Sequence, residues 1–378
     1  MGNLLSSYYF IPTRCPYTLY VIYSFSNMKW QEPKKKSQEL LYLPVLQKQP
    51  EIDFDNIKTA DSNTSVNVDH EFINIWQNGP KDDSDKELAK CLSIVGKAFC
   101  DLIRAGQGKT AVSTKSSPTD LVTEVDMGIE MLFRMWLKKF CPTHKVIGEE
   151  SVKDFINPQD TAWYIDPVDG TTNFVNGSQN VSLHMGCLCN GKPKASFVGL
   201  PFLGQYYYGH DKVLNKKNEP AFILDNITKK ISEPLVIGTE FIVSKLDHKT
   251  NFDLITKKLD AKKYQVKSIG FNMMQILNGQ INVFYKESAK FWDVVAPAAL
   301  IYMAAKDFFD IEIYYTKNGA TKTKDNTICE SLFSNSTNFI EHLNNRHKTN
   351  CRIGHILITP KSRLEIKKAI LDIIIKGQ

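Results

Sequence analysis

Acidic residues at the ends of apolar segments are the part of this 378-residue sequence that could do chemistry. The stretch WYIDPVDGTTNF, residues 163–174, places Asp166 and Asp169 on either side of a proline, directly after an apolar run. Three more acidic residues stand in similar places: Asp126, Glu149 and Asp293. Each of them alone is explained by a turn or a helix cap. Together they indicate a hard cation such as Mg²⁺, because crowded carboxylates need compensation and Mg²⁺ prefers oxygen ligands.

The residues that follow the two aspartates suit a phosphate group. Gly170 lets the backbone come close to a ligand, and Thr171 begins a segment that would offer N–H groups at a helix start. Such a helix end holds an anion through its exposed donors and its dipole. Nearby metal ions can neutralise a phosphate monoester and activate water, so no nucleophilic Ser or Cys is required.

The elements that must position these residues alternate between helices and strands. Apolar residues at three- and four-residue steps predict helices at 85–106, with Asp85 as its cap, and at 123–140. The pair Asn190-Gly191 predicts a primed turn between strands 181–189 and 194–200. Further strands are expected at 146–147, 162–165, 235–243, 264–269 and 281–285, and further helices at 251–260, 271–277, 292–305 and from Thr359-Pro360 through Ile374. This order predicts a layered α/β or α+β body.

The first 84 residues differ in composition from the rest of the chain. Lys, Gln, Asn, Asp and Ser dominate residues 31–83, as is typical of segments with little order. We therefore expect an extension of low order at residues 1–84 and a folded domain at 85–378. The opening Met-Gly-Asn-Leu-Leu-Ser matches the myristoylation pattern with Gly2 as acceptor. One acyl chain would give only weak membrane association.

Charge, hydropathy and cysteine spacing limit the classes of protein to which the chain can belong. The net charge of +6 suits an anionic metabolite. The sequence contains no dense block of Arg and Lys with interleaved aromatics, which is the pattern that would predict nucleic-acid binding. No uninterrupted apolar run reaches the 18 or so residues that a membrane-spanning helix needs. The eight cysteines lack CxxC or zinc spacing, which indicates reduced thiols and a cytoplasmic location.

Four segments resemble, in the same order, those of the inositol monophosphatase superfamily of Mg²⁺-dependent, often lithium-sensitive phosphatases. Residues 163–174 are similar to its first signature, and residues 291–298, FWDVVAPA, are similar to its second. Residues 115–126 and 148–151 match two further segments. The similarity extends from about residue 85 to the C-terminus. It implies the α-β-α-β-α sandwich of the inositol monophosphatase and fructose-1,6-bisphosphatase type, commonly a homodimer.

The resemblance also implies roles for individual residues. Two or three Mg²⁺ ions would be held by Glu149, Asp166, the backbone carbonyl of Val168, Asp169 and Asp293. Glu149 and Thr171 would orient the attacking water, and Asp126 would support the Thr171 hydroxyl as a proton relay. The backbone N–H groups of Gly170 and Thr171 would hold the phosphate, with Asp293 beside the substrate.

The substrate signals conflict. Inositol-selective relatives have an acidic residue seven positions before the aspartate of the second signature, where this chain has Lys286. A lysine facing the leaving group would suit a second phosphate. Against that, residues 172–174, TNF, resemble the inositol-type first signature. The sequence therefore predicts a phosphomonoesterase acting on inositol monophosphate or a similar sugar or polyol phosphate. The alternatives are a 3′(2′),5′-bisphosphate nucleotidase acting on phosphoadenosine phosphate and a catalytically inactive, lipid-anchored binding protein.

Overall fold

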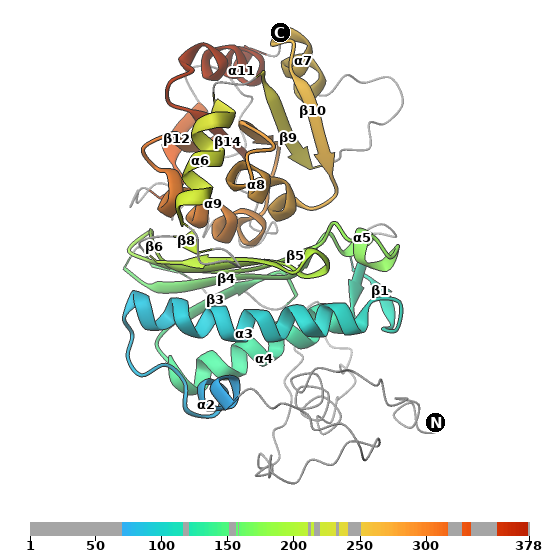
Figure 1. Ribbon diagram of the computed structural model, residues 1–378, viewed down its shortest axis with the longest axis vertical. Coiled ribbons are helices and arrows are strands. Elements are labelled where there is room, and N and C mark those ends of the chain that lie inside the picture. The colour runs from blue at the N-terminus through green and yellow to red at the C-terminus, as the bar shows by residue number, and fades with distance from the viewer. Residues whose placement is uncertain are drawn as a thin grey trace.

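Five layers of secondary structure are stacked in the chain: helices, a sheet, helices, a second sheet and helices (Figure 1). The computed structural model describes residues 70–115, 121–150, 156–157, 159–210, 213–214, 220–231, 234–240, 251–316, 327–333 and 354–376. Three clusters of buried apolar side chains fill the spaces between successive layers. The α-β-α-β-α sandwich expected from the sequence is therefore confirmed.

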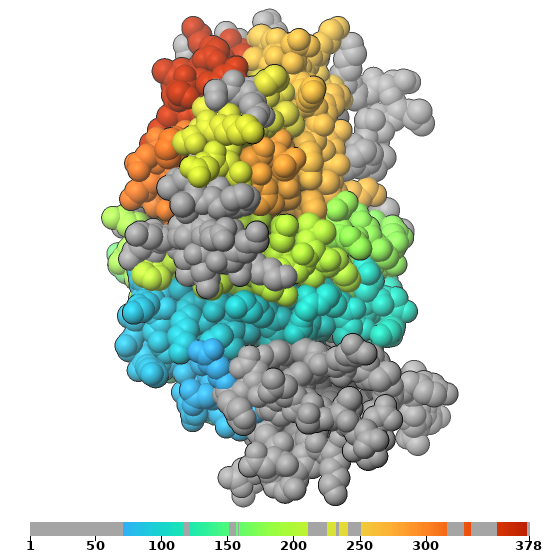
Figure 2. All heavy atoms as spheres, viewed as in Figure 1, coloured from blue at the N-terminus to red at the C-terminus, as the bar shows by residue number. Residues whose placement is uncertain are grey.

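The first helical layer lies under the first sheet, at the blue end of the colour scale (Figure 2). It contains α2 (His70–Asn78), α3 (Asp85–Gly106) and α4 (Glu124–Phe140). The cap of α3 is Ser84, not Asp85, because the Ser84 hydroxyl accepts a hydrogen bond from the Glu87 backbone N–H at 3.3 Å. Thr123 caps α4 in the same way.

Helix α2 falls inside the segment that was expected to have little order, and that expectation is wrong for residues 70–78. Phe72 and Ile75 of α2 are buried, and the Trp136 indole N–H donates to the Ile75 carbonyl at 3.1 Å. The composition of residues 31–83 is strongly polar, so two buried side chains within it leave little trace in the sequence.

The first sheet has the order β3-β4-β5-β6-β7-β8. Its strands are β3 (Lys145–Gly148), β4 (Thr161–Asp169), β5 (Ser182–Cys189), β6 (Lys192–Leu200), β7 (Gln205–Gly209) and β8 (Val213–Leu214). Asn190 and Gly191 both have positive φ, of 52° and 69°, between β5 and β6. The primed hairpin turn predicted from Asn-Gly is thereby confirmed. A small hairpin of β1 (Val112–Thr114) and β2 (Leu121–Thr123) precedes this sheet.

The middle layer is made of helices, and the two that lie between residues 269 and 305 are buried along most of their length, as expected for helices covered on both sides. These are α6 (Pro220–Ile231), α8 (Ile269–Leu277) and α9 (Phe291–Ala305). Backbone packing is close, since a Cβ at Gly186 of β5 would lie 3.0 Å from the Ala296 Cα of α9. Helix α8 begins at Ile269 after the cap Ser268, so the strand expected to continue through residue 269 ends earlier.

The second sheet has the order β10-β9-β11-β14-β12-β13. Its strands are β9 (Val236–Glu240), β10 (Lys262–Val266), β11 (Val283–Lys286), β12 (Phe309–Thr316), β13 (Thr327–Ser331) and β14 (His355–Pro360). The last layer contains α7 (Asn251–Lys258) and α11 (Leu364–Lys376). The closing helix was predicted to start at Thr359 and Pro360, and this prediction is wrong. These two residues end the buried strand β14, which lies between β11 and β12.

Two further expectations concern the thiols and the membrane. All six cysteines within the described ranges are free thiols, as the spacing predicted. Among the helices that the structure describes, none combines the length and apolar character that crossing a bilayer requires.

Candidate active site

A β-bulge in β4 brings the two aspartates of the first signature to one face of the sheet. Side chains three positions apart on a regular strand point to opposite faces. Here Asp166 lies opposite His184, whereas Asp169 lies opposite Ser182, two residues away on β5. From Asp166 to Asp169 the chain advances three residues on β4 but only two on β5. The extra residue on β4 forms the bulge and turns both aspartates to the same face of the sheet. Pro167 suits this irregular point because it has no N–H to pair.

Glu149, Asp166 and Asp293 form a group that could hold a metal ion. One carboxylate oxygen from each lies within 4.8 Å of the others. Glu149 follows β3, Asp166 lies in β4 and Asp293 lies in the first turn of α9, so three separate elements meet here. Three carboxylate oxygens at this separation fit a hard divalent cation, which takes oxygen ligands.

The electrostatics of the group favour a bound cation. Burial raises the pKa of Asp166 well above its usual range, and the charges of Glu149, Asp169 and Asp293 raise it further. Burial also raises the pKa of Asp293 to about 7, although the nearby Lys290 opposes this effect. Buried carboxylates with raised pKa values are stabilised in their ionised form by a divalent ion.

Two lysines contact this group. The Lys290 ammonium lies 2.7 Å from Glu149 Oε1, and the Lys115 ammonium lies 3.2 Å from the same oxygen. Lys115 also forms an ion pair with Glu150 at 2.6 Å. Burial alone would raise the pKa of Glu149, but the charges of Lys290 and Lys115 hold it below its usual value.

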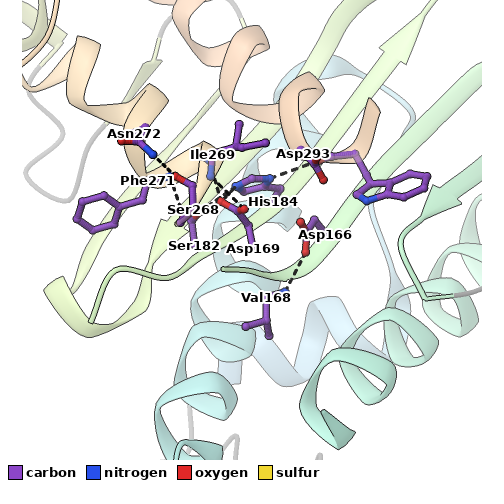
Figure 3. A network of polar contacts seen from close by, with 12 residues as sticks. Asp166, Val168, Asp169, Ser182, His184, Ser268, Ile269, Phe271, Asn272 and Asp293 are labelled. Atoms are coloured by element: carbon purple, nitrogen blue, oxygen red, sulfur yellow. Dashed lines mark hydrogen bonds and ion pairs between the residues drawn. The ribbon is translucent and has the colours of Figure 1, made fainter. Parts of the chain in front are cut away.

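Asp169 is turned toward protein donors, and the structure does not bring it into the group of Glu149, Asp166 and Asp293. Figure 3 shows its carboxylate among Ser182, His184, Ser268 and Ile269. Burial alone would raise the pKa of Asp169, but hydrogen bonds from His184, Ser268 and Ser182 hold it below the ordinary value. His184 is fully buried in this network, as expected for a histidine in an apolar strand.

Thr171 and Asp126 meet as the sequence predicted. The Thr171 hydroxyl lies 3.3 Å from Asp126 Oδ1 and 3.0 Å from the Val168 carbonyl oxygen, either of which can accept its proton. Asp126 also accepts hydrogen bonds from the backbone N–H and the hydroxyl of Thr123. Burial raises the pKa of Asp126 to about 6, against the opposing effect of the Thr123 hydrogen bonds.

Gly170 begins the short helix α5 (Thr171–Val175) in a conformation that favours glycine. Its φ is +87°, and a Cβ there would lie 2.7 Å from the Lys267 carbonyl oxygen. Both the backbone angle and the lack of space exclude a larger residue.

Lys286 lies at the end of β11 and forms an ion pair with Glu240 of β9 at 2.8 Å. Its charge is therefore compensated within the second sheet.

Several supporting residues were not singled out from the sequence. Glu130 of α4 is buried, pairs with Arg134 at 3.0 Å and accepts the Glu150 backbone N–H at 2.8 Å, so it anchors the turn that carries Glu149. Lys290 and Ser268 were likewise not assigned roles. The one available signal was position, since Lys290 comes directly before the second signature.

Residues 85–344 match the sequence profile described as the inositol monophosphatase family. The chain belongs to this family. Inositol monophosphatase 2 of Solanum lycopersicum is 29% identical over 215 residues, which cover 53% of this chain and 78% of that protein. Inositol monophosphatase 1 of Homo sapiens is 27% identical over 229 residues, covering 57% and 79%. Members of the inositol monophosphatase family are phosphomonoesterases, and this chain is one of its phosphatases.

Solved structures with the inositol monophosphatase fold superpose on most of the chain. An IMPase/NADP phosphatase complexed with NADP and Ca²⁺ gives a TM-score of 0.56 at 18% identity, covering 77% of this chain and 96% of that one. A staphylococcal inositol monophosphatase-1 in an inhibitory complex soaked in LiCl gives 0.55 at 18% identity, with the same coverage. At this identity the likeness shows the fold.

Proposed function

We propose that the chain hydrolyses inositol monophosphate or a similar small sugar or polyol phosphate with the help of Mg²⁺. The observation that carries this proposal is the meeting of Glu149, Asp166 and Asp293 within 4.8 Å, in a chain of the inositol monophosphatase family. Related proteins support it through their names, and one neighbouring structure of an IMPase/NADP phosphatase contains Mg²⁺ and phosphate.

The proposed Mg²⁺ ligands are the carboxylates of Glu149, Asp166 and Asp293 and the backbone carbonyl of Val168. Bound Mg²⁺ would supply charge neutralisation on the phosphate and a lowered pKa for water. Thr171 is proposed to orient the attacking water through its hydroxyl, which contacts both Val168 and Asp126. Asp126 is proposed to accept a proton from that hydroxyl. The backbone N–H groups of Gly170 and Thr171 are proposed to hold the phosphate oxygens, with Asp293 beside the substrate.

Of the two substrate classes, we favour a monophosphate over a nucleotide bisphosphate. A second phosphate would need an uncompensated cation near the leaving group. Lys286, the residue that suggested such a group, is already paired with Glu240 at 2.8 Å. We therefore propose the bisphosphate nucleotidase only as the alternative. The lithium-soaked inhibitory complex of the staphylococcal neighbour supports the proposal that Li⁺ inhibits this chain too.

A substrate comparison tests the proposal directly. Phosphate release by the purified chain would be measured from inositol 1-phosphate, NADP and phosphoadenosine phosphate, with Mg²⁺ or with EDTA. We expect hydrolysis of inositol 1-phosphate with Mg²⁺ and none with EDTA. A preference of about tenfold or more in kcat/KM for a nucleotide would replace the proposed substrate. Absence of hydrolysis from all three would favour the inactive binding protein.

The variant Asp166→Asn separates metal binding from folding. Asp166 is buried with a raised pKa, so a neutral amide relieves charge crowding and the metal-free protein should unfold at the same temperature or a higher one. We expect phosphate release to fall at least about a hundredfold, because a ligand is lost. Stabilisation by added Mg²⁺ in thermal unfolding should disappear as well. Full activity in Asp166→Asn would exclude this residue as a ligand.

Location and assembly stay predictions. We propose a cytoplasmic homodimer with weak membrane association through myristoylated Gly2, a residue outside the described ranges. A Gly2→Ala variant that distributes between membrane and soluble fractions as the parent does would count against the lipid anchor.

A further inference from the structure

The connection between β11 and α9 leads directly into the candidate active site. It consists of residues 287–290, which follow the end of β11 and precede the first residue of α9. Its last residue, Lys290, places its ammonium 2.7 Å from Glu149 Oε1 and donates its backbone N–H to Asp293 Oδ2 at 3.0 Å. A shift of this connection would therefore move the contacts of two proposed ligands at once.

This connection contains a backbone conformation that residues with a side chain rarely adopt. Ser288 has a φ of +54°, in the left-handed region. Elsewhere in the described ranges, the non-glycine residues with positive φ are Asn190 and Asp260, two residue types that tolerate this region better than serine does. Such a conformation persists only where the surrounding contacts impose it. On one side of Ser288, the Ala289 backbone N–H donates to the Gly354 carbonyl oxygen at 3.2 Å.

Glu287 holds the other side of that turn from the outer face of the second sheet, the face that packs against α7 and α11. Tyr285 of β11 belongs to the buried cluster on this face. Glu287 Oε1 accepts hydrogen bonds from the Tyr285 hydroxyl at 3.1 Å and from the side-chain amide of Asn251, the first residue of α7. The carboxylate of Glu287 therefore ties the connection to a strand and to a helix of the outer layer.

A further contact joins Tyr285 to the start of β14. The Tyr285 hydroxyl lies 2.9 Å from His355 Nδ1, and the two rings stack with their centres 5.9 Å apart. Because the hydroxyl proton goes to Glu287, His355 Nδ1 carries a hydrogen that it donates to the Tyr285 oxygen. Tyr285 and His355 are 1% and 3% exposed, so water does not compete for these bonds.

We propose that Glu287 and Tyr285 are positioning residues for the active site. They hold the turn at Ser288, and this turn keeps Lys290 and Asp293 beside the other proposed ligands. The inference rests on the proposed function for the identity of the site. It extends that site to side chains on the outer face of the second sheet, which act through the connection and not by contact with substrate.

The affinity for Mn²⁺, a paramagnetic substitute for Mg²⁺, tests this inference without relying on catalysis. The full chain is stripped of metal and titrated without substrate, and free Mn²⁺ is measured by electron paramagnetic resonance. We expect the dissociation constant of Mn²⁺ to rise about tenfold in Tyr285→Phe and in Glu287→Ala, as is typical when a group that orients metal ligands is lost. Glu287→Gln keeps an acceptor oxygen for the Tyr285 hydroxyl and should restore most of the affinity.

The double variant Tyr285→Phe/Glu287→Ala tests whether the two residues act as one unit. They share a hydrogen bond, so removing both should cost little more than removing either. We expect a dissociation constant about tenfold above that of the wild-type chain, whereas independent effects would multiply to about a hundredfold.

Tyr314→Phe is the matched control. Tyr314 of β12 is 1% exposed, like Tyr285, and its hydroxyl donates to Glu312, two residues away, at 2.8 Å. It belongs to the same buried cluster on the same sheet, but the strand that follows β12 is β13, which pairs with it at the edge of the sheet. Both Tyr→Phe variants should lower the unfolding temperature by about 2 °C. Only Tyr285→Phe should change the Mn²⁺ affinity.

Three outcomes would overturn the inference. These are a wild-type chain that binds no Mn²⁺, wild-type affinity in both Tyr285→Phe and Glu287→Ala, and an equal loss of affinity in Tyr314→Phe. Failure of the proposed function looks different. Weakened Mn²⁺ binding in the two variants, together with no phosphate release by the wild-type chain, would reject the proposed function and leave the inference standing.

Discussion

Individual carboxylates in this phosphatase differ in role because their neighbours differ. Asp166 and Asp169 belong to the same short motif, yet burial and neighbouring charge raise the pKa of Asp166, whereas donated hydrogen bonds lower that of Asp169. Asp293 combines both situations, since it accepts the Lys290 backbone N–H and lies beside Glu149. A carboxylate that faces other carboxylates is suited to a cation, and one that faces N–H and O–H donors is suited to a structural role.

Asp169→Asn should destabilise the protein without changing its metal content. The amide removes the charge and places N–H groups against the buried donors of Ser182, Ser268 and α8. We expect the free energy of unfolding, measured in urea, to fall by about 3 kcal/mol. The number of Mn²⁺ ions bound per chain, counted by electron paramagnetic resonance with Mn²⁺ in place of Mg²⁺, should stay unchanged. The exposed Asp307→Asn is a control that should stay within about 0.5 kcal/mol. Loss of Mn²⁺ binding with unchanged stability would instead make Asp169 a metal ligand.

At the scale of elements, helix starts and strand ends carry the site. Glu149 follows β3, the first signature ends β4, and Asp293 lies in the first turn of α9. Polar side chains at these ends satisfy backbone groups that regular elements leave unpaired. The same positions expose backbone N–H groups and carboxylates to a ligand. Serine caps recur at the starts of α3 and α8, where Ser84 and Ser268 accept backbone N–H groups.

Ser84→Ala should cost about 1 kcal/mol in urea unfolding, because α3 loses the side-chain acceptor for the Glu87 N–H. Ser84→Asp keeps an acceptor at this position and should retain the wild-type stability. The opposite pattern, with Ser84→Ala neutral and Asp85→Ala costing about 1 kcal/mol, would restore Asp85 as the cap.

The whole molecule carries a cluster of buried carboxylates, and its stability should depend on pH accordingly. Burial raises the pKa of Asp126 to about 6 and that of Glu150 to about 8, the latter with a further contribution from Glu149. Between the ordinary carboxylate pKa of about 4 and these raised values, the folded state binds more protons than the unfolded state. Stability contributed by these groups is therefore present below about pH 4 and lost as pH rises through 6 to 8.

In EDTA, we expect the unfolding temperature to be lower at pH 8 than at pH 6, by on the order of 5 °C. Added Mg²⁺ should narrow this difference, because the ion stabilises ionised carboxylates. Asp126→Asn should show a shallower decline between about pH 4 and pH 6. An unfolding temperature in EDTA that rises from pH 6 to pH 8 would contradict the assigned direction of these pKa shifts.

Prediction from the sequence worked best where neighbouring residues specify a local structure. Asn190-Gly191 predicted its hairpin turn, and apolar periodicity predicted α3 and α4. It failed at Thr359-Pro360, because a proline suits the end of a strand as well as the start of a helix. Helix α2 was missed because its burial depends on contacts with α3 and α4, such as the bond from Trp136 to Ile75.

By itself the sequence determined the family and the layered fold, since these follow from motifs in which each residue lies near its partners along the chain. The meeting of acidic residues from separate motifs was expected only through the resemblance to that family. Only the tertiary structure decided which of those acidic residues face one another and which accept hydrogen bonds from protein donors. Asp169 is occupied by Ser268, 99 residues away, and Glu149 is paired with Lys290, 141 residues away. No local pattern records such distant pairs, because hydrogen bonds and ion pairs are short-ranged in space and indifferent to separation along the chain.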